Sequence, residues 1–307
     1  MLSAPELSYL SSSLRLDEPI RPDGRLPSQC MNVSLQLDVV ESGFGSATVS
    51  RHADGAEVTA VVKAQCTPNT DGIPQIVVSV IPPPDSDMAQ SAEASHGANT
   101  LANLLRQALL SSIPFSALRI GPHHAFTLYL DIAINISGDI IFDSLPPLSK
   151  LPVHLCSFAA YSALKSAKLP TLDATQSDLS YFTNEDRQAI INNPQIPVFD
   201  SDWSNSRPLC SEWSPPLLLL YAICGTNILL DPTSLEQAVC DSGLIAIVSE
   251  EGVILHSELV RLGQGTVLLS GSGSDRRRVC RSDQISKILL DSQQHARSFI
   301  KALNVSA

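Results

Sequence analysis

Alternation of apolar and polar residues predicts a set of strands in the first half of the chain. "NVSLQLDVV" (32–40) alternates with a period of two, as a half-buried strand does. "GSATVSRHADGAEVTAVVKAQC" (45–66) holds two such patterns joined by Ala-Asp-Gly, which is a hairpin signal. "QIVVSVI" (75–81) and the long run "AFTLYLDIAINIS" (125–137) predict two more strands. These segments together are typical of a sheet with one buried face.

A different period marks the helices of this half. A short helix is expected at 3–15. "NTLANLLRQALLSS" (99–112) places its leucines on one helical face, with Asn99 or Thr100 available as the N-cap. "LPVHLCSFAAYSALKSA" (151–167) carries a second apolar stripe. Both longer helices are therefore expected to pack against the sheet.

The second half repeats the same combination of elements. "PLLLLYAIC" (216–224) and "ILLDPT" (228–233) predict two strands, and "GLIAIVSEEGVILHSELV" (243–260) predicts a hairpin with Glu-Glu-Gly at its tip. "SDQISKILLDSQQHARSFIKAL" (282–303) predicts a closing amphipathic helix capped by Ser282. The repetition indicates a duplicated α+β unit, with mostly antiparallel sheets and helices on one side of each.

Between the halves lies a segment without periodicity. Residues 171–216 contain seven acidic residues against two arginines, together with both tryptophans and several prolines. We interpret this stretch as an irregular acidic linker. The predicted organisation is an N-terminal lead at 1–20, a first domain at 21–170, the linker, and a second domain at 217–307.

The composition is that of a globular protein. With 307 residues, 44% of them hydrophobic and only 17% charged, the chain can bury a sizeable core. A formal charge of −11 argues against a surface covered by nucleic acid, since phosphate contacts need Lys and Arg. Seven scattered cysteines without a Cys-x-x-Cys pair predict free thiols in a reducing compartment. Because neither a signal peptide nor a membrane-length apolar run is visible, we expect a soluble intracellular protein.

Candidate chemistry is weak when each motif is taken alone. Asp231 with Glu236, and Glu250 with Glu251, are carboxylate pairs, but a strand-ending turn and a hairpin tip explain them more simply. His123 and its neighbour His124 have no further ligand at metal-binding spacing. The glycine-rich "GQGTVLLSGSGS" lacks the lysine of a phosphate loop. The basic "DRRRVCR" could touch RNA, but a charged loop beside the closing helix explains it more simply. The residues by themselves predict no catalytic centre and no metal site.

The segment "RPDGRLPSQC" (21–30) is the least ordinary motif. Pro22 fixes φ and Gly24 accepts a positive φ, so a tight turn is expected. Arg21 and Arg25 on either side could bind carboxylates or phosphates. Three interpretations stay open from local chemistry: a nucleic-acid contact, part of a phosphate site, or a structural staple.

Taken in order, "RPDGRLPSQC", the 45–66 hairpin, "FTLYLDIAINISGDI" and "ILLDPTSLEQAVCDSGLIAIV" resemble the RNase PH family, in its exosome-ring branch. The resemblance runs from about residue 7 to the end. It implies two βαβ domains of the type seen in domain 2 of ribosomal protein S5, and a ring of such subunits threaded by RNA. In that setting Arg21, Asp23 and Arg25 form a structural N-terminal turn that pairs locally or across a subunit boundary.

The chain departs from the pattern of the family's active members. These hold inorganic phosphate with a Gly-x-Arg segment, whereas "SGDIIFDSLPPLSKLPVHL" (137–155) has no arginine. Of the family's acid set in the second domain, Asp231 aligns, but Thr233 and Gln237 stand at the other two positions. Arginines of the first-domain helix are replaced as well, by Asn103, Gln107 and Leu110. Because phosphorolysis needs cationic donors and an acid or metal partner, these departures predict a subunit without catalytic residues.

The resemblance therefore implies a non-catalytic structural subunit of the RNA exosome core ring, supporting 3′-to-5′ RNA processing and degradation. Expected partners are other RNase PH-like ring subunits, S1/KH cap proteins, an associated exoribonuclease and RNA in the pore, with no membrane and no cofactor. Expected locations are the nucleus, the nucleolus and also the cytoplasm. RNA-binding candidates, chosen by position, are Arg106, Arg119 and His123. The alternatives are an active phosphorolytic exoribonuclease and a stand-alone RNA-binding module.

Overall fold

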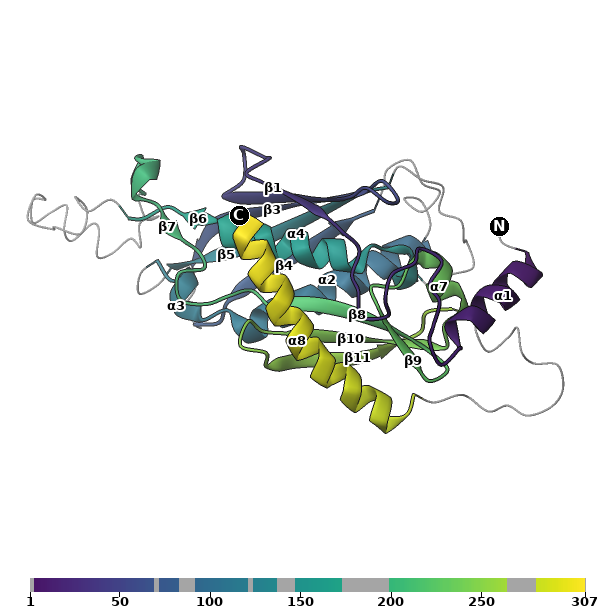
Figure 1. Cartoon of the computed structure of the whole chain (residues 1–307). Coiled ribbons are helices and arrows are strands. Elements are labelled where there is room, and N and C mark those ends of the chain that lie inside the picture. Colours follow the sequence, from purple (N-terminus) through teal and green to yellow (C-terminus); the bar gives the residue numbers. More distant parts are fainter. Residues whose placement is uncertain are drawn as a thin grey trace, which may run out of the picture.

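The computed structural model describes residues 3–68, 72–82, 92–120, 124–136, 147–172, 199–263 and 280–306. Its main elements form two sheets with helices between and beside them (Figure 1). The first half contains α1 Ala4–Leu14, β1 Ser34–Leu37, β2 Gly45–Arg51, β3 Ala56–Pro68, β4 Gln75–Ile81, α2 Ala92–Ser112, α3 Phe115–Leu118, β5 His124–Ile136, η2 Pro147–Lys150, α4 Val153–Ser166 and β6 Lys168–Leu169. The second half contains η4 Trp203–Asn205, β7 Arg207–Pro208, β8 Leu217–Cys224, β9 Asn227–Leu230, α7 Ser234–Val239, β10 Ser242–Val248, β11 Ile254–Val260 and α8 Ser282–Ser306.

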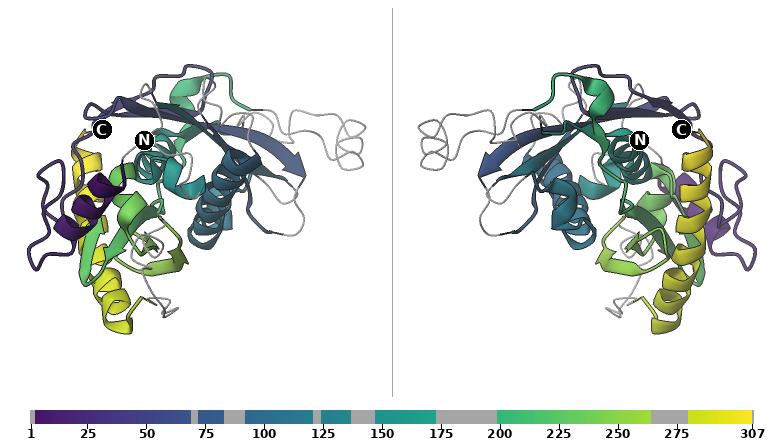
Figure 2. Two further views of the ribbon diagram at one scale, coloured as in Figure 1. Left: turned by 90° about the vertical axis from the view of Figure 1, so that its right-hand side faces the viewer. Right: turned by 90° about the vertical axis from the view of Figure 1, so that its left-hand side faces the viewer.

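The first sheet has the strand order β1-β2-β3-β5-β4. All its pairs are antiparallel except β4 with β5, which run parallel. Helices α2 and α4 pack against this sheet, α2 on β4 and α4 on β2 and β3, and both lie beneath it in Figure 2. The inward residues of β3 illustrate why: Val58, Ala60 and Val62 are fully buried, while the alternating positions are partly or fully exposed.

The second sheet, in the order β11-β10-β8-β9, is wholly antiparallel, and its inner strands β8 and β10 are buried on both faces. Along β8, Leu218 and Leu220 belong to the core shared with α4 and the first sheet. Leu219 and Tyr221 belong to a second core, which α8 completes with Ile288 and Ala296. An uninterrupted apolar run is the sequence pattern of a strand covered on both sides, which explains "LLLLYAIC". The layers are therefore first sheet, α2 with α4, second sheet, and α8 outermost (Figure 2).

Close packing of α4 on the first sheet depends on one glycine. Gly45 begins β2 where α4 ends, and a Cβ atom there would lie 2.5 Å from the Cα of Ala167. The amide of Lys168 then donates to the carbonyl of Phe44 at 2.9 Å, so the helix terminus is joined to the sheet through its backbone. This contact fixes the end of α4 opposite to the one that lines the site described below.

The α+β class and the mostly antiparallel sheets expected from the sequence are confirmed, but helices on one side only are found for the first sheet alone, since the second sheet has α4 on one face and α8 on the other. The helix predicted at 99–112 is longer than expected, since α2 begins at Ala92. The pattern does not predict α7, whose six residues are too few for a helical period. In the predicted linker, 173–198 lie outside the described residues, while 199–216 supply η4 and β7. The two sheets fall within the predicted domains 21–170 and 217–307, whose boundaries stay a prediction.

Two further expectations concern cysteines and membranes. All seven cysteines are free thiols, with Cys156, Cys224 and Cys240 buried and the others half-buried. Within the described residues, no helix combines the length and apolar character needed to cross a membrane.

Candidate functional site

The turn at residues 21–25 joins the N-terminal segment to the second sheet. Arg21 is buried and binds the buried Glu236 of α7 through both carboxylate oxygens, Nε to Oε1 at 2.7 Å and Nη2 to Oε2 at 2.8 Å. Its remaining N–H groups donate to the carbonyl oxygens of Leu230 at 3.0 Å and Asp231 at 2.9 Å. A guanidinium suits this position because its planar fork satisfies a carboxylate and two carbonyls at once. Arg21 thus connects the N-terminal turn to the end of β9.

The other two residues of the turn extend the same network. Arg25 Nε donates to Asp23 Oδ2 at 2.7 Å, and Arg25 Nη1 reaches Asp231 Oδ2 at 3.3 Å. Gly24 between them has φ +73°, a left-handed conformation that favours glycine. Arg21, Asp23 and Arg25 therefore pair with one another and with Asp231 and Glu236 of the second sheet's connection.

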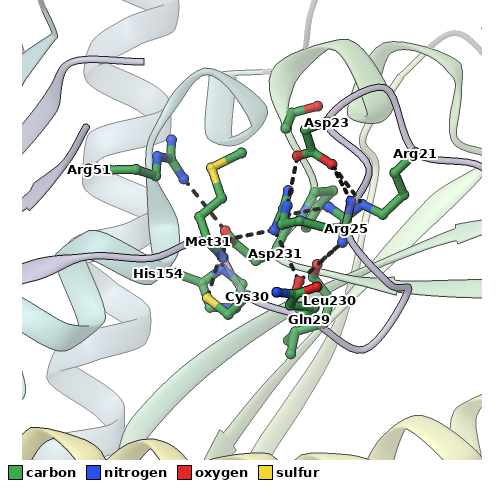
Figure 3. A network of polar contacts seen from close by, with 12 residues as sticks. Arg21, Asp23, Arg25, Gln29, Cys30, Met31, Arg51, His154, Leu230 and Asp231 are labelled. Atoms are coloured by element: carbon green, nitrogen blue, oxygen red, sulfur yellow. Dashed lines mark hydrogen bonds and ion pairs between the residues drawn. The ribbon is translucent and has the colours of Figure 1, made fainter. Parts of the chain in front are cut away.

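Asp231 is the centre of the site (Figure 3). It follows β9 with φ +50° and is 4% exposed. Its carboxylate is surrounded by donors from four separate segments: Arg25 at 3.3 Å, the Cys30 thiol at 3.2 Å, the Met31 amide at 3.0 Å, Arg51 Nη1 at 3.6 Å and His154 Nδ1 at 3.2 Å. Both carboxylate oxygens therefore have partners within the protein: Oδ2 binds Arg25, Cys30 and Met31, and Oδ1 lies against Arg51 and His154.

The ring of His154 is held in one tautomer. Its Nε2 accepts a hydrogen bond from the Leu220 amide at 3.2 Å, so this nitrogen carries no proton. The proton is therefore on Nδ1, from which it is donated to Asp231 Oδ1. His154 lies in the first turn of α4, and Leu220 is in the middle of β8. The imidazole thus links α4 to the second sheet while satisfying Asp231.

The electrostatics of the site favour an ionised Asp231. Burial alone would raise the pKa of this carboxyl, but His154, Arg51 and the Met31 amide outweigh it, so the pKa lies well below its usual range. Burial, reinforced by the nearby Asp231 charge, raises the pKa of the Cys30 thiol. The thiol is therefore a neutral donor to the carboxylate.

A cavity of about 680 Å³ opens beside this network, between the two sheets. Its walls come from the 51–56 hairpin turn, η2, the N-terminus of α4, and the segment from Asp231 to Gln237. Pro152 is the N-cap of α4 and supplies no side-chain cap. This is the place where the sequence resemblance expects a phosphate site and an acid set to meet.

The family's other acid positions have structural roles here. The Thr233 hydroxyl accepts from the Glu236 amide at 3.2 Å, and Glu236 Oε2 accepts from the Thr233 amide at 2.8 Å, forming a capping box at the start of α7. Gln237 Nε2 donates to the Pro232 carbonyl at 3.0 Å. On α2, Asn103 and Gln107 are exposed. Asp231 is therefore the one carboxylate of the predicted acid set, and it is bound by side chains and a main-chain amide of this chain.

The predicted RNA-binding residues lie elsewhere. Arg106 is exposed on α2, and its Nε donates to the Ile76 carbonyl of β4 at 3.0 Å. Arg119 is the exposed C-cap of α3, next to the start of β5 through a bridge to Ala125. His123 lies outside the described residues. The RNA-binding assignment stays a prediction.

The sequence did not predict two residues of the site, Arg51 and His154, nor the ion pair between Glu236 and Arg21. A Thr-x-x-Glu capping signal at 233–236 was available and would have placed Glu236 at a helix start. Nothing in the local pattern marks Arg51, at the end of β2, or His154, inside an apolar helix stripe. Both become functional only through contacts between distant segments.

The chain is similar in sequence and in fold to known proteins. No family model matches the chain. It is 30% identical over 247 residues to the Saccharomyces cerevisiae protein named exosome complex component RRP42, covering 80% of each chain. The chain belongs to the RRP42 family of exosome complex components.

Two further similarities agree with this family. The Schizosaccharomyces pombe exosome complex component rrp42 is 29% identical over 271 residues, covering 86% of this chain and 84% of that one. A solved structure of the Archaeoglobus fulgidus exosome with RNA bound to the active site shares the fold, with a TM-score of 0.64, 19% identity and 97% coverage of both chains. The resemblance of the sequence to an exosome ring subunit is thereby confirmed.

Replacing Glu236 by Gln should destabilise the fold strongly. The substitution keeps the shape of the side chain and its capping bond but leaves the buried Arg21 charge with only the Asp23 carboxylate, 3.9 Å from its Nε, and losing a buried partner costs about 3 to 5 kcal/mol. Asp23→Asn is the matched control, since Asp23 is partly exposed and its pairs should contribute about 0 to 1 kcal/mol. Urea unfolding followed by circular dichroism measures both. Equal effects of the two variants would contradict a structural role for the Arg21–Glu236 pair.

The low pKa of Asp231 predicts a specific acid sensitivity. Its contribution to stability is complete above the ordinary aspartate pKa of about 3.9 and is lost as the pH falls below that value towards the lower pKa of the folded state. Unfolding free energies at pH 7, 5, 4 and 3 should fall more steeply for the wild type than for Asp231→Asn, by up to about 1.4 kcal/mol per pH unit. Parallel curves would show that Asp231 is not held ionised by the fold.

Proposed function

We propose that this chain is a non-catalytic structural subunit of an RNA exosome core ring, supporting 3′-to-5′ RNA processing and degradation, including ribosomal RNA maturation. Its partners are other RNase PH-like ring subunits, S1/KH cap proteins, an associated exoribonuclease and RNA in the central pore. It acts in the nucleus and nucleolus, and also in the cytoplasm. Membership of the RRP42 family and the fold shared with solved exosome structures support the assembly part of this proposal.

One observation carries the non-catalytic part: the carboxylate of Asp231 is already bound on both oxygens. A catalytic acid must exchange a proton with the reacting group or coordinate a metal ion that does so. Asp231 contacts His154 and Arg51 instead, and these contacts depress its pKa. Thr233 and Gln237, at the other two acid positions, cannot replace a carboxylate in either task.

The cavity also has few cationic groups available to bind inorganic phosphate. Phosphorolysis needs fixed cationic donors for a dianion. Arg51 lines the cavity, but its guanidinium binds Asp54 at 2.9 Å through Nε and approaches Asp231 at 3.6 Å. Lys150 is the other cationic side chain on the cavity wall, in the segment where Gly-x-Arg is absent. The cavity therefore lies where the resemblance expects a phosphate site, while the Arg51 guanidinium on its wall is paired with carboxylates of the protein itself.

The chain alone should show no phosphorolytic activity. Incubating it with single-stranded RNA and inorganic phosphate at high protein concentration should release no nucleoside diphosphates, because the paired Asp231 has no acidic neighbour from the family set. Anion-exchange chromatography of the products measures this. A phosphate-dependent diphosphate product that disappears in a natively folded Asp231→Ala variant would favour the active exoribonuclease.

RNA contacts of this subunit should matter only inside the assembled ring. Changing Arg119 to Glu in a reconstituted ring should weaken binding to all sequences alike and reduce the salt slope by about one unit, as expected for one lost phosphate contact. RNA protection and affinity at several salt concentrations measure both effects. Ser116→Glu, on the exposed side of α3, controls for added negative charge. A slope and protected length equal to wild type would remove Arg119 from the pore, and tight salt-sensitive binding by the chain alone would favour an autonomous RNA-binding module.

A further inference from the structure

Two buried cysteines lie next to each other at the point where β10 begins to pair with β8. Cys224 is the last residue of β8, and Cys240 is the C-cap of α7. The Asp241 amide donates to the Ile223 carbonyl at 2.9 Å, which aligns the two cysteines on neighbouring segments. Both side chains belong to the core shared with α4 and the first sheet, so they lie on the same face of the second sheet. A hydrogen bond joins the two thiols.

The pairing of β8 with β10 brings these two backbone positions within reach of a disulfide. Residues that face each other on antiparallel strands have Cα atoms about 4.5 to 5.5 Å apart, and a disulfide spans about 4.4 to 6.8 Å between Cα atoms. Both cysteines are free thiols in this structure. The covalent bond could therefore form without a large change in the backbone.

The two thiols differ in how readily they lose a proton. The hydrogen bond from Cys240 lowers the pKa of Cys224, and the nearby Arg15 guanidinium acts in the same direction against burial. The same hydrogen bond, together with burial, raises the pKa of Cys240. The charges of Asp241 and Glu236 disfavour both thiolates, although Asp241 is itself paired with Arg15 at 2.8 Å. Because the thiolate is the reactive form of cysteine, Cys224 is the nucleophile of the pair.

We propose that Cys224 and Cys240 are a redox-active dithiol, which a peroxide converts into a disulfide. First, the Cys224 sulfur attacks one oxygen of hydrogen peroxide, the O–O bond breaks, and the leaving hydroxide becomes water with the proton that Cys224 released. Next, the Cys240 sulfur attacks the sulfenic acid of Cys224, the S–S bond forms, and the hydroxide leaves as water with the Cys240 proton. The two thiols lose two electrons in total, and one peroxide becomes two waters. The inference is independent of the proposed ring function.

The disulfide would close a loop around the centre of the candidate site. Residues 225–239 lie between the two cysteines and include β9, Asp231, Glu236 and all of α7. A cross-link across such a loop restricts the unfolded chain and so stabilises the folded one. Oxidation would thus fasten the segment whose two acids bind the N-terminal turn and α4.

Helix α1 controls access to the pair. Both thiols are fully buried, so an oxidant reaches them only after a local opening. The end of α1 lies over this region, where Arg15 binds Asp241 and the Leu14 carbonyl accepts from Asn227 Nδ2 at 2.9 Å. The same helix contacts α7 (Figure 1). With only Leu10 and Leu14 buried, this terminal helix should open more readily than the sheets.

Peroxide treatment of the full chain tests the proposal. After oxidation of the folded protein, the remaining thiols are alkylated in denaturant and the peptides are analysed by mass spectrometry. The link between Cys224 and Cys240 should form before oxidation of the half-buried Cys66 and Cys280, because burial raises the pKa of both of these thiols. Dithiothreitol should reverse the link. The oxidised chain should unfold at a higher urea concentration than the same chain after reduction.

Single substitutions separate the roles of the two thiols. In Cys240→Ser, the sulfenic acid on Cys224 should persist and react with dimedone, and peroxide should not raise the urea midpoint. In Cys224→Ser, Cys240 should give no dimedone adduct. Cys66→Ser is the matched control and should form the disulfide as the wild type does. Urea unfolding of each reduced variant confirms its fold, and the wild-type measurement decides by itself if a variant does not fold.

The route through α1 is tested with two leucines of equal burial. Leu14→Ala should speed disulfide formation about tenfold or more, because losing a buried leucine weakens the docking of α1. Leu101→Ala removes the same group from α2 and should leave the rate close to that of the wild type.

Three results would overturn the proposal. One is oxidation of other cysteines without a link between Cys224 and Cys240. Another is a link that forms only in urea, or that both leucine substitutions accelerate equally, since the pair would then react only after global unfolding. The third is a Cys224 sulfenic acid that persists in the wild type, which would show that Cys240 does not resolve it.

Discussion

The ion pairs and hydrogen bonds around Asp231 and Glu236 fix how the two sheets meet. Arg51 comes from the first sheet, His154 from α4, Arg21 and Arg25 from the N-terminal turn, and the two acids from the segment after β9. Apolar packing between layers is strong but only weakly directional, so by itself it would tolerate small shifts of one sheet over the other. Buried charges do not, because each requires its partners at short distance. The network therefore defines one relative placement of the layers.

The same network also explains why a cavity lies beside Asp231. The cavity exists because the hairpin turn, α4 and the β9 end converge, and they converge because Asp231 binds all of them. A carboxylate with this task cannot also supply a proton or hold a metal ion without loosening the layers it joins. In this chain, the contacts between the layers depend on this residue. A catalytic acid would need an accessible carboxylate oxygen, whereas both oxygens of Asp231 contact donors of the protein.

Much of the fold could be predicted from the sequence because its elements have clear periods. The two-residue alternation of 45–66 and the leucine stripe of α2 each specify an element and the face that it buries. The run in β8 is ambiguous by period, and only its placement between α4 and α8 shows why both faces are apolar. The short α7 has no period to detect, although its capping residues are visible in the sequence.

The site was less predictable, for a physical reason. Asp231 and the arginines of the turn stand out in the sequence, whereas Arg51 and His154 acquire their roles through contacts across more than sixty positions. Local patterns report on neighbours along the chain and carry little information about which distant charges will share a buried pocket. The assignment of Asp231 to an acid set came from a family resemblance, and the structure adds what that acid does in this chain.

Polar groups need hydrogen-bonding partners both inside the protein and at the edge of a sheet, but the partners differ. Inside, the Asp231 carboxylate is surrounded by donors, since an unpaired buried charge would prevent folding. Among the described residues, β4 pairs on one side only, with β5, and water can satisfy main-chain groups that have no protein partner. Water does not satisfy the apolar side chains beside them, and these gain free energy only when another surface covers them. The described residues thus satisfy their buried charges within the chain and leave Val77 and Ile81 of β4 exposed.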